Sequence, residues 1–375
     1  MHERILVFTD WFSPGFRAGG PIRSLVNLTE SVGIPFDIVT RNTDHYSTTP
    51  YELPVGQWIE HNPLVRVMYL PESELSLSRI RDFIKLDYRR IYLNSLWSPR
   101  FTLLPLVATR MCGQTSRVII APRGMLKPGA LAIKSTKKKL LIAFLKLSGV
   151  ATRVGWHATN EEERNEIVLH FAAPSNIRVA PNLPAIIPTP LPPPEKKVAA
   201  LKLISIARIS AEKGIQEALE FLKSVQNSGS IRVDFYGTFQ DEKFLEVCRE
   251  QAASLEGIDC VFHGELPPGE IANRMRDAHF FFLPTRGENY GHAIVEALQY
   301  GRPVIISDRT PWKFSDDDAA GFSLPLDVES FSIVLKRCLN MDQNAYNWAC
   351  KAAADRGKKI VSDPAVLEAC RHIFE

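Results

Sequence analysis

The sequence has few cysteines, and their spacing forms no recognisable pattern. The chain of 375 residues has six of them, at irregular intervals and without a C-x-x-C pair. A disulfide framework or a zinc site needs paired or regularly spaced cysteines, so both are disfavoured. Scattered buried thiols are typical of a reducing compartment, which predicts a cytoplasmic protein.

Long apolar runs and a leader segment are also lacking. No stretch approaches the roughly 20 apolar residues that a helix needs to span a bilayer. The first residues, Met1-His2-Glu3-Arg4, run directly into an apolar strand pattern, without the charged lead and cleavage site of a signal peptide. We therefore expect a soluble protein without a secretion signal, which can still sit at the inner face of the plasma membrane.

A basic excess and a dinucleotide fingerprint are absent as well. Lys and Arg number 45 against 42 Asp and Glu, a formal net charge of +3, whereas a dedicated nucleic-acid binder carries a large basic excess. No G-x-G-x-x-G motif is present, which disfavours an NAD(P) enzyme. We expect neither a nucleic-acid partner nor a bound cofactor.

What the sequence does contain is an alternation of short apolar runs and helical patterns, the signature of parallel α/β sheets. Seven prolines between Pro181 and Pro194 are incompatible with helix or sheet interiors and predict a stiff linker. The predicted fold class is α/β, with two Rossmann-like parallel-sheet domains, 1–183 and 195–355, facing a cleft. The C-terminal helix, about 356–375, is expected to pack back on the first domain. The runs that predict strands are 5–8, 36–39, 65–68, 91–93, 118–120, 155–157, 177–179, 203–207, 231–235, 280–284 and 304–306.

The most informative segment, 284–298, follows one predicted strand and opens a helix. Gly287 and Gly291 form the turn, and the free N–H groups of a helix start can hold a diphosphate. Glu288 stands in the loop, where its carboxylate can accept hydrogen bonds from sugar hydroxyls. Glu296 follows about two turns later, a position suited to the two hydroxyls of a ribose.

A second segment, Ala207 to Gly214, ends the first predicted strand of the second domain. Its Arg208 and Lys213 place two positive charges at this strand end. Taken alone, this segment is also explained as a basic turn at a strand end. Its occurrence together with Glu288 and Glu296 favours the functional interpretation.

These segments resemble the family-4 (group 1) retaining glycosyltransferases of GT-B fold. Residues 284–298 look like the E-x7-E motif of that family, and residues 297–305 look like its helix–Gly–Pro–strand sequel. Residues 207–214 resemble its G-R-x-x-x-E-K-G element, with Ala207 where glycine is common. The resemblance covers most of the chain but is specific only around 205–214 and 284–308.

The resemblance implies a hexosyltransferase of enzyme class 2.4 that uses a nucleoside-diphosphate sugar as co-substrate in polysaccharide biosynthesis. The sugar would pass to a hydroxyl of a glycan or lipid-linked glycan with retention and without an obligatory metal. The implied catalytic residues are Arg208, Lys213 and Glu288. The implied donor-binding residues are Gly19, Gly20, Arg208, Lys213, Glu288, Asn289, Tyr290, Gly291, His292 and Glu296.

Candidates on the acceptor side are Arg123 and His157, each of which follows a predicted strand. The resembled family often has a histidine near Arg123, and its absence leaves the acceptor chemistry open. A core histidine is an equally good interpretation of His157. The acidic run 316–318 superficially matches a metal-binding D-x-D, but a solvated acidic turn is favoured, so no metal site is expected.

The segment 134–146 combines a basic cluster with apolar residues. One interpretation is a helix whose apolar side faces the core while its lysines are solvated. The other is contact with an anionic membrane that carries a lipid-linked acceptor.

Two alternative functions fit the same motifs. One is a sugar-nucleotide epimerase of the same fold, which would act on its donor without an acceptor. The other is a non-catalytic subunit that binds a nucleotide sugar within a glycan assembly complex.

Overall fold

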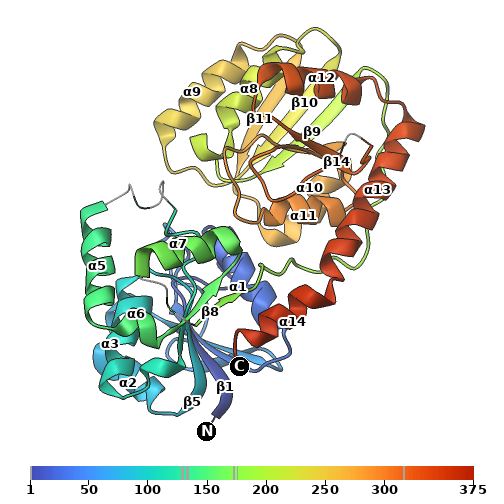
Figure 1. Cartoon of the computed structure of the whole chain (residues 1–375). Helices are drawn as coiled ribbons and strands as arrows, with labels where there is room; N and C mark the ends of the chain where they lie inside the picture. The colour runs from blue at the N-terminus through green and yellow to red at the C-terminus, as the bar shows by residue number, and fades with distance from the viewer. Residues whose placement is uncertain (1, 128–130, 132–134, 172–173, 175, 316) are drawn as a thin grey trace. The chain divides into compact units, whose positions relative to one another are not determined.

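The structure, a computed structural model, describes residues 2–127, 131, 135–171, 174, 176–315 and 317–375. The chain divides into two compact units, Met1–Leu183 with Asp363–Glu375, and Pro184–Ser362. Each unit is a sheet with helices on both faces (Figure 1). The proline-rich segment from Pro184 onward therefore groups with the second unit. The chain returns to the first unit at Asp363 rather than near residue 356.

The first unit contains an eight-stranded sheet of order β3-β4-β2-β1-β5-β6-β7-β8. Its neighbouring strands run parallel, except that β3 lies antiparallel to β4 at one edge. The strands are β1 His2–Phe8, β2 Phe36–Arg41, β3 Trp58–Asn62, β4 Val65–Leu70, β5 Tyr88–Leu93, β6 Val118–Ile120, β7 Gly155–Ala158 and β8 Ile177–Val179.

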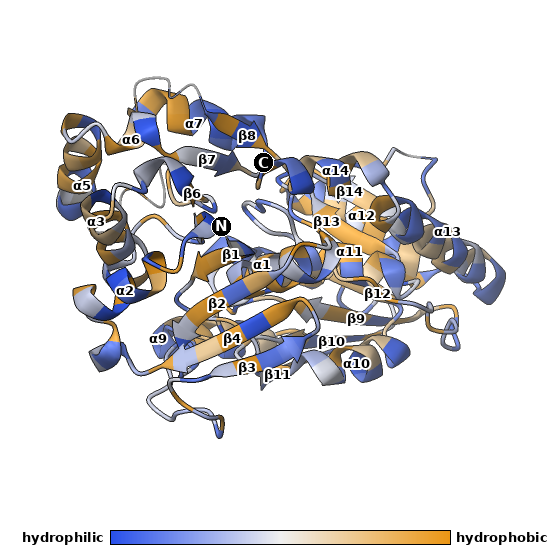
Figure 2. Ribbon diagram, turned by 90° about the horizontal axis from the view of Figure 1, so that it is seen from below, coloured by the Kyte–Doolittle hydropathy of each residue, from blue (hydrophilic) through white to orange (hydrophobic). Residues whose placement is uncertain are grey.

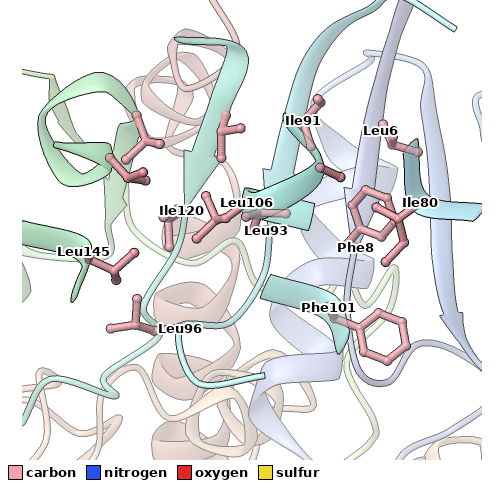
Figure 3. Close-up of a cluster of buried hydrophobic side chains, with 14 of the residues drawn as sticks. Leu6, Phe8, Ile80, Ile91, Leu93, Leu96, Phe101, Leu106, Ile120 and Leu145 are labelled. Atoms are coloured by element: carbon pink, nitrogen blue, oxygen red, sulfur yellow. The ribbon is translucent and has the colours of Figure 1, made fainter. Parts of the chain in front are cut away.

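Helices cover both faces of this sheet because its strands are apolar on both sides. Along β1, Leu6 and Phe8 enter one apolar cluster while Ile5 and Val7 enter another, as the two-residue period of a strand requires. Figure 3 shows the first cluster, in which Leu6 and Phe8 lie with Ile80. The helices on that face are α2 Leu77–Ile84, α3 Leu104–Met111, α5 Ser135–Leu147, α6 Val150–Arg153 and α7 Glu161–Phe171, and on the other face α1 Gly20–Ser31 and α14 Pro364–His372. Three single-turn helices complete the unit: Glu72–Glu74, Pro99–Leu103 and Thr115–Arg117.

The second unit contains a six-stranded, fully parallel sheet of order β11-β10-β9-β12-β13-β14. Its strands are β9 Ala200–Ile206, β10 Ser230–Tyr236, β11 Ile258–Gly264, β12 Phe280–Leu283, β13 Val304–Ser307 and β14 Gly321–Leu324. Leu203 and Phe282 face one apolar cluster, and Ile204 and Phe281 face the other. The central strands β12 and β13 are correspondingly hydrophobic along their length (Figure 2).

Six helices surround this sheet, with Leu219 of α8 and Leu335 of α12 in one cluster and Met275 of α10 and Leu298 of α11 in the other. They are α8 Ile215–Lys223, α9 Glu242–Ala253, α10 Ile271–Asp277, α11 His292–Gln299, α12 Val328–Leu339 and α13 Gln343–Val361, with single turns at Ala211–Lys213 and Pro268–Glu270. The predicted α/β class with two parallel-sheet units is confirmed. Among the described residues, no helix is both long and apolar enough to cross a bilayer.

The proline-rich segment is held against the second unit by side chains of α11 and the turn after it. Gln299 donates to the carbonyl of Ala185 at 2.9 Å and accepts from the N–H of Ile187 at 2.9 Å. Arg302 is fully buried and donates to the carbonyls of Pro192 and Met275. The proline-rich segment lies in no strand, so the carbonyls of Ala185 and Pro192 have no strand partners, and these two side chains satisfy them.

A buried carboxylate ties its own strand, β2, to three other strands of the first sheet, β1, β4 and β5. Asp37 of β2 accepts hydrogen bonds from Arg4 at 2.6 Å, from Arg66 at 2.6 and 2.9 Å, and from Tyr88 at 2.8 Å. Burial alone would raise the pKa of Asp37. The hydrogen bonds from Arg66 and Tyr88 and the charge of Arg4 outweigh it and lower the pKa.

We expect Asp37→Asn to lower the free energy of unfolding of the first unit by about 2–4 kcal/mol near neutral pH, because it leaves two arginines without their anion. Since the folded-state pKa is depressed, the wild-type contribution is present above the unfolded pKa and is lost as pH falls through the folded pKa. Urea unfolding at several pH values should therefore show the two proteins converging in acid. The control Asp82→Asn changes an exposed carboxylate and should cost under about 1 kcal/mol. A variant as stable as the wild type near neutral pH would contradict this account.

Candidate functional site

The two sequence motifs of the second unit lie at the ends of neighbouring parallel strands. β9 and β12 pair through Leu203 with Phe280 and Ile204 with Phe281. The loop 207–214 leaves the carboxyl end of β9, and the loop 284–291 leaves that of β12. Open α/β sheets bind ligands outside this edge, so the fold brings both motifs to a suitable place.

A close approach of backbone holds the two loops together. Gly214 has a φ of +71°, and a Cβ atom placed on it would lie 1.7 Å from the carbonyl oxygen of Pro284. Only glycine fits this position, both for its left-handed backbone and for the missing side chain. The contact is extended by Arg286, whose N–H donates to the carbonyl of Glu212 at 2.9 Å.

Lys213 and Glu288 meet directly as a result. The ammonium group of Lys213 lies 2.6 Å from Oε1 of Glu288, and the two side chains are only 13% and 14% exposed. Arg208 lies in the same loop as Lys213, is more exposed, and pairs with Glu212 at 3.2 Å. The structure thus joins two of the three predicted catalytic side chains in one ion pair and places the third nearby in sequence on the same loop.

The helix α11 begins beside this ion pair. Gly291 takes the left-handed conformation at its N-cap, with a φ of 79°, and as a glycine it has no side chain with which to cap the helix. The first N–H groups of a helix have no acceptor within the helix and carry its positive dipole end, which suits an anion. His292 and Glu296 are both buried and lie four residues apart, hence on one side of α11.

Asn289 and Tyr290 complete the loop between Glu288 and the helix. The ring of Tyr290 lies 4.7 Å from that of His292 and 5.3 Å from that of Trp312. Trp312 also donates from its indole N–H to the carbonyl of Tyr290. This tryptophan supports the loop from a segment that carries no recognisable motif, and the sequence alone gave no sign of it.

Two further supports also escaped the sequence interpretation. The guanidinium of Arg286 donates to Glu217 of α8 at 2.5 Å. The hydroxyl of Ser307, at the end of β13, donates to the carbonyl of Thr285 at 2.5 Å. A serine or glutamate at a strand or helix end is too common to be singled out, and only the fold shows what these two contact.

In the first unit, the predicted glycines lie at the start of α1. Gly19 is the N-cap residue, with a φ of 69°, and Gly20 opens the helix. The preceding turn is fixed by the buried carboxylate of Asp44, which accepts from the N–H groups of Phe16 and Arg17 at 2.9 and 3.2 Å. The assignment of Gly19 and Gly20 to the donor remains a prediction.

Arg123 anchors a polar network inside the first unit. Its guanidinium donates to Asn94 at 2.8 Å, to Asn182 at 2.5 Å and to the hydroxyl of Tyr92 at 2.8 Å. All three partners are buried. Each guanidinium nitrogen therefore has a protein acceptor, and a role toward the acceptor substrate stays a prediction.

His157 belongs to the same network. Its Nε2 lies 2.9 Å from the carbonyl oxygen of Ala180, which only accepts, so Nε2 carries the proton. Its Nδ1 then accepts from the hydroxyl of Tyr92 at 2.7 Å. Burial, reinforced by the charge of Arg123, lowers the pKa of His157 to about 3, so the ring is neutral. The contacts fit the core interpretation, and an acceptor role for His157 also stays a prediction.

Asp10 lies just after the carboxyl end of β1 in the first sheet, and the sequence interpretation missed it. It follows β1 and accepts hydrogen bonds from Arg41 at 3.0 Å and from the hydroxyl of Ser98 at 3.0 Å. Burial raises the pKa of Asp10, although both partners oppose that shift. A carboxylate directly after a buried strand was the available signal.

A protein metal site needs a cluster of acidic, histidine or cysteine side chains. No group of three or more that could hold an ion is found among the described residues. Of the acidic run 316–318, Asp316 lies outside the described residues. Asp318 accepts from the N–H of Ala320 at 3.0 Å, as a turn residue does.

Comparison with known proteins agrees with the motif segments. Residues 192–314 match the family model of the glycosyl transferases, group 1. The alpha-monoglucosyldiacylglycerol synthase of Streptococcus pneumoniae is 35% identical over 105 residues, which are 28% of this chain and 23% of that protein. The match to this curated relative thus spans less than a quarter of its length.

Solved structures resemble the whole chain. Sucrose-phosphate synthase from Thermosynechococcus elongatus has a TM-score of 0.69 at 17% identity, covering 98% of this chain and 97% of that chain. HepE from Anabaena, solved with UDP and glucose, has a TM-score of 0.69 at 14% identity, covering 98% of both. At such identities the likeness shows the fold, which is GT-B. The family match and the fold together support a group 1 glycosyltransferase.

The contact at Gly214 provides a test of this site geometry. We expect Gly214→Ala to lower the free energy of unfolding of the second unit by more than about 2 kcal/mol, since a methyl group adds a backbone clash to the usual 1–2 kcal/mol of left-handed strain. Gly264→Ala is the matched control: its φ is +79°, but no atom lies within 4 Å of the added Cβ. Calorimetry should show the larger loss for Gly214→Ala. Equal losses would mean that the two loops are not held as described.

Proposed function

We propose that this protein transfers a hexose-type sugar from a nucleoside-diphosphate sugar to a hydroxyl of a glycan or lipid-linked glycan. The observation that carries the proposal is the nearly buried Lys213–Glu288 pair at 2.6 Å, in which Glu288 stands on the loop that leads into α11. A cation and helix N–H groups suit a diphosphate, and a carboxylate next to them suits sugar hydroxyls. A nucleoside-diphosphate sugar carries both a diphosphate and sugar hydroxyls.

In this reaction the bond between the sugar C1 and the diphosphate oxygen breaks, and a bond from C1 to the acceptor oxygen forms. The departing diphosphate gains negative charge, which Lys213, Arg208 and the helix dipole of α11 would stabilise. Glu288 would hold the sugar through its hydroxyls. Glu296, about one turn into α11, would accept from the ribose.

Retention of the anomeric configuration is part of the proposal. Glu288 is engaged in an ion pair with Lys213 at 2.6 Å, whereas a retaining hydrolase uses two carboxylates about 5 Å apart, one of them as a nucleophile. An acceptor hydroxyl that attacks from the face of the leaving group needs no such pair, since a diphosphate oxygen can take its proton. Proton NMR of freshly formed product identifies the anomer, and an inverted product would rule this course out.

The comparisons support a nucleotide-sugar donor in general and make a uridine nucleotide the first candidate. The similar structure of HepE was solved with UDP and glucose. A thermal-shift panel of UDP-, GDP-, ADP- and TDP-sugars identifies the donor, because a ligand that binds only the folded state raises its stability.

Donor binding should depend on Glu296. We expect Glu296→Gln to weaken binding of the nucleotide at least tenfold, because an amide replaces a charge-assisted acceptor for the ribose. The matched control is Glu220→Gln, an exposed position of the same unit. Isothermal titration with the nucleoside diphosphate measures both, and wild-type affinity in Glu296→Gln would count against the donor assignment.

Turnover should depend on Lys213 more than binding does. We expect Lys213→Met to lower kcat by about 100- to 1,000-fold, the usual cost of removing one group that stabilises developing negative charge. Glu288→Gln should also lower kcat, since it disrupts the sugar-side hydrogen bonds. Initial rates at saturating donor and acceptor measure the effect. If Lys213→Met changed only the KM for the donor, Lys213 would bind the donor without stabilising the transition state.

A further inference from the structure

The helix α5, Ser135–Leu147, presents apolar side chains to solvent. Leu140, Phe144 and Leu147 are 66%, 57% and 89% exposed. They stand four and three residues apart, so they form one stripe along the helix. The opposite side of α5 is packed, with Ile142 and Leu145 buried in the first apolar cluster. The helix therefore has two apolar sides, one packed on the core and one exposed to solvent.

Exposed lysines border this stripe on both sides. At 100° per residue, Lys137 lies on one flank, and Lys139 and Lys146 lie on the other. The helix has no acidic residue, so nothing on α5 neutralises them. Lys138 points to the packed side instead, where its ammonium lies 5.7 Å from the ring of Trp97. We call the exposed stripe with its three flanking lysines the α5 face.

A groove runs along the second flank of this face. It has a volume of about 400 Å³ and is lined by Leu131, Lys139, Ile142, Ala143, Lys146 and His170. Apolar side chains line its interior, and two lysines stand among them. The neighbouring helix α7 adds the exposed Leu169 next to His170, at the end of α7 far from its acidic first turn. Figure 1 shows α5 and α7 side by side along the first unit.

We propose that the α5 face docks the protein on an anionic phospholipid bilayer. Leu140, Phe144 and Leu147 would enter the boundary between headgroups and acyl chains, while the flanking lysines would reach lipid phosphates. The groove would receive part of one lipid, with its chain against Ile142 and its phosphate near Lys139 and Lys146. Docking is inferred from the α5 face alone and does not depend on the proposed function. That it brings the site to a lipid-linked acceptor rests on the proposed function.

Charge selects a bilayer over a second copy of the chain as the occupant. A symmetric self-contact would bring the same patch of two copies together and set these lysines against each other. An anionic bilayer supplies the opposite charge over the whole length of the helix. It also accepts a stripe of apolar side chains without requiring a shaped partner surface.

Vesicle binding of the full chain tests the proposal. The wild type should sediment with phosphatidylglycerol–phosphatidylcholine vesicles and bind pure phosphatidylcholine vesicles at least tenfold more weakly. Two triple variants should each weaken binding to the anionic vesicles at least tenfold: Lys137→Glu/Lys139→Glu/Lys146→Glu, and Leu140→Gln/Phe144→Gln/Leu147→Gln. Binding by the wild type should also fall with rising salt, because exposed charges are screened.

Matched controls lie on the second unit, which has exposed lysines and exposed apolar residues of its own. Lys223→Glu/Lys243→Glu/Lys351→Glu and Val247→Gln/Ile333→Gln/Trp348→Gln should bind vesicles like the wild type. Circular dichroism checks that every variant is folded. The thermal shift by the donor should persist in all of them, so a failure of docking is distinct from a failure of the proposed function.

Three results would overturn the proposal. The first is that both α5 variants bind anionic vesicles as tightly as the wild type. The second is that the wild type fails to bind anionic vesicles, or binds neutral vesicles equally well. The third is a dimer in analytical ultracentrifugation that the α5 variants dissolve, which would assign this face to a second copy.

Discussion

The candidate site depends on one steric constraint, the contact of Gly214 with the carbonyl of Pro284. It allows the turn before α8 to lie against the end of β12, and so sets Lys213 within 2.6 Å of Glu288. The two residues are 75 positions apart in the chain. A side chain at position 214 would separate the loops, and the ion pair would separate with them.

The ion pair has a physical consequence for ligand binding. Two opposite charges that are both nearly buried satisfy each other, so neither bears the full cost of leaving water. They remain fixed in position when a ligand arrives, and fixed charges stabilise a transition state without having to reorganise. Arg208 differs, because it is more exposed and bound only to a neighbour on its own loop. In the proposed reaction Arg208 would adjust to the ligand, whereas Lys213 and Glu288 would define where the ligand lies.

The sequence predicted the central strands and the two motif loops of the second unit because both depend on local patterns. Apolar runs mark β1, β9, β12 and β13, and glycines with nearby charges mark the loops 207–214 and 284–291. The edge strands β3, β11 and β14 were not predicted, since they are only partly buried and their residues do not form apolar runs. The supports from Trp312 and Ser307 depend on contacts between distant segments, which no local pattern encodes.

The proposed acceptor residues of the first unit are harder to predict from sequence than the proposed donor residues of the second unit. A diphosphate needs cations and free backbone N–H groups wherever it binds, so its binding residues recur as a local sequence motif. The family match covers residues 192–314, which include both motif loops. In the first unit, Arg123 and His157 follow strands as site residues do. Both hydrogen-bond to Tyr92, and their other partners are amide side chains for Arg123 and the carbonyl of Ala180 for His157. A polar residue at a strand end thus satisfies the same sequence pattern whether it binds a substrate or closes the core. Its partners in the fold bear on the two cases; those of Arg123 and His157 fit the core interpretation, and the acceptor role of both stays a prediction.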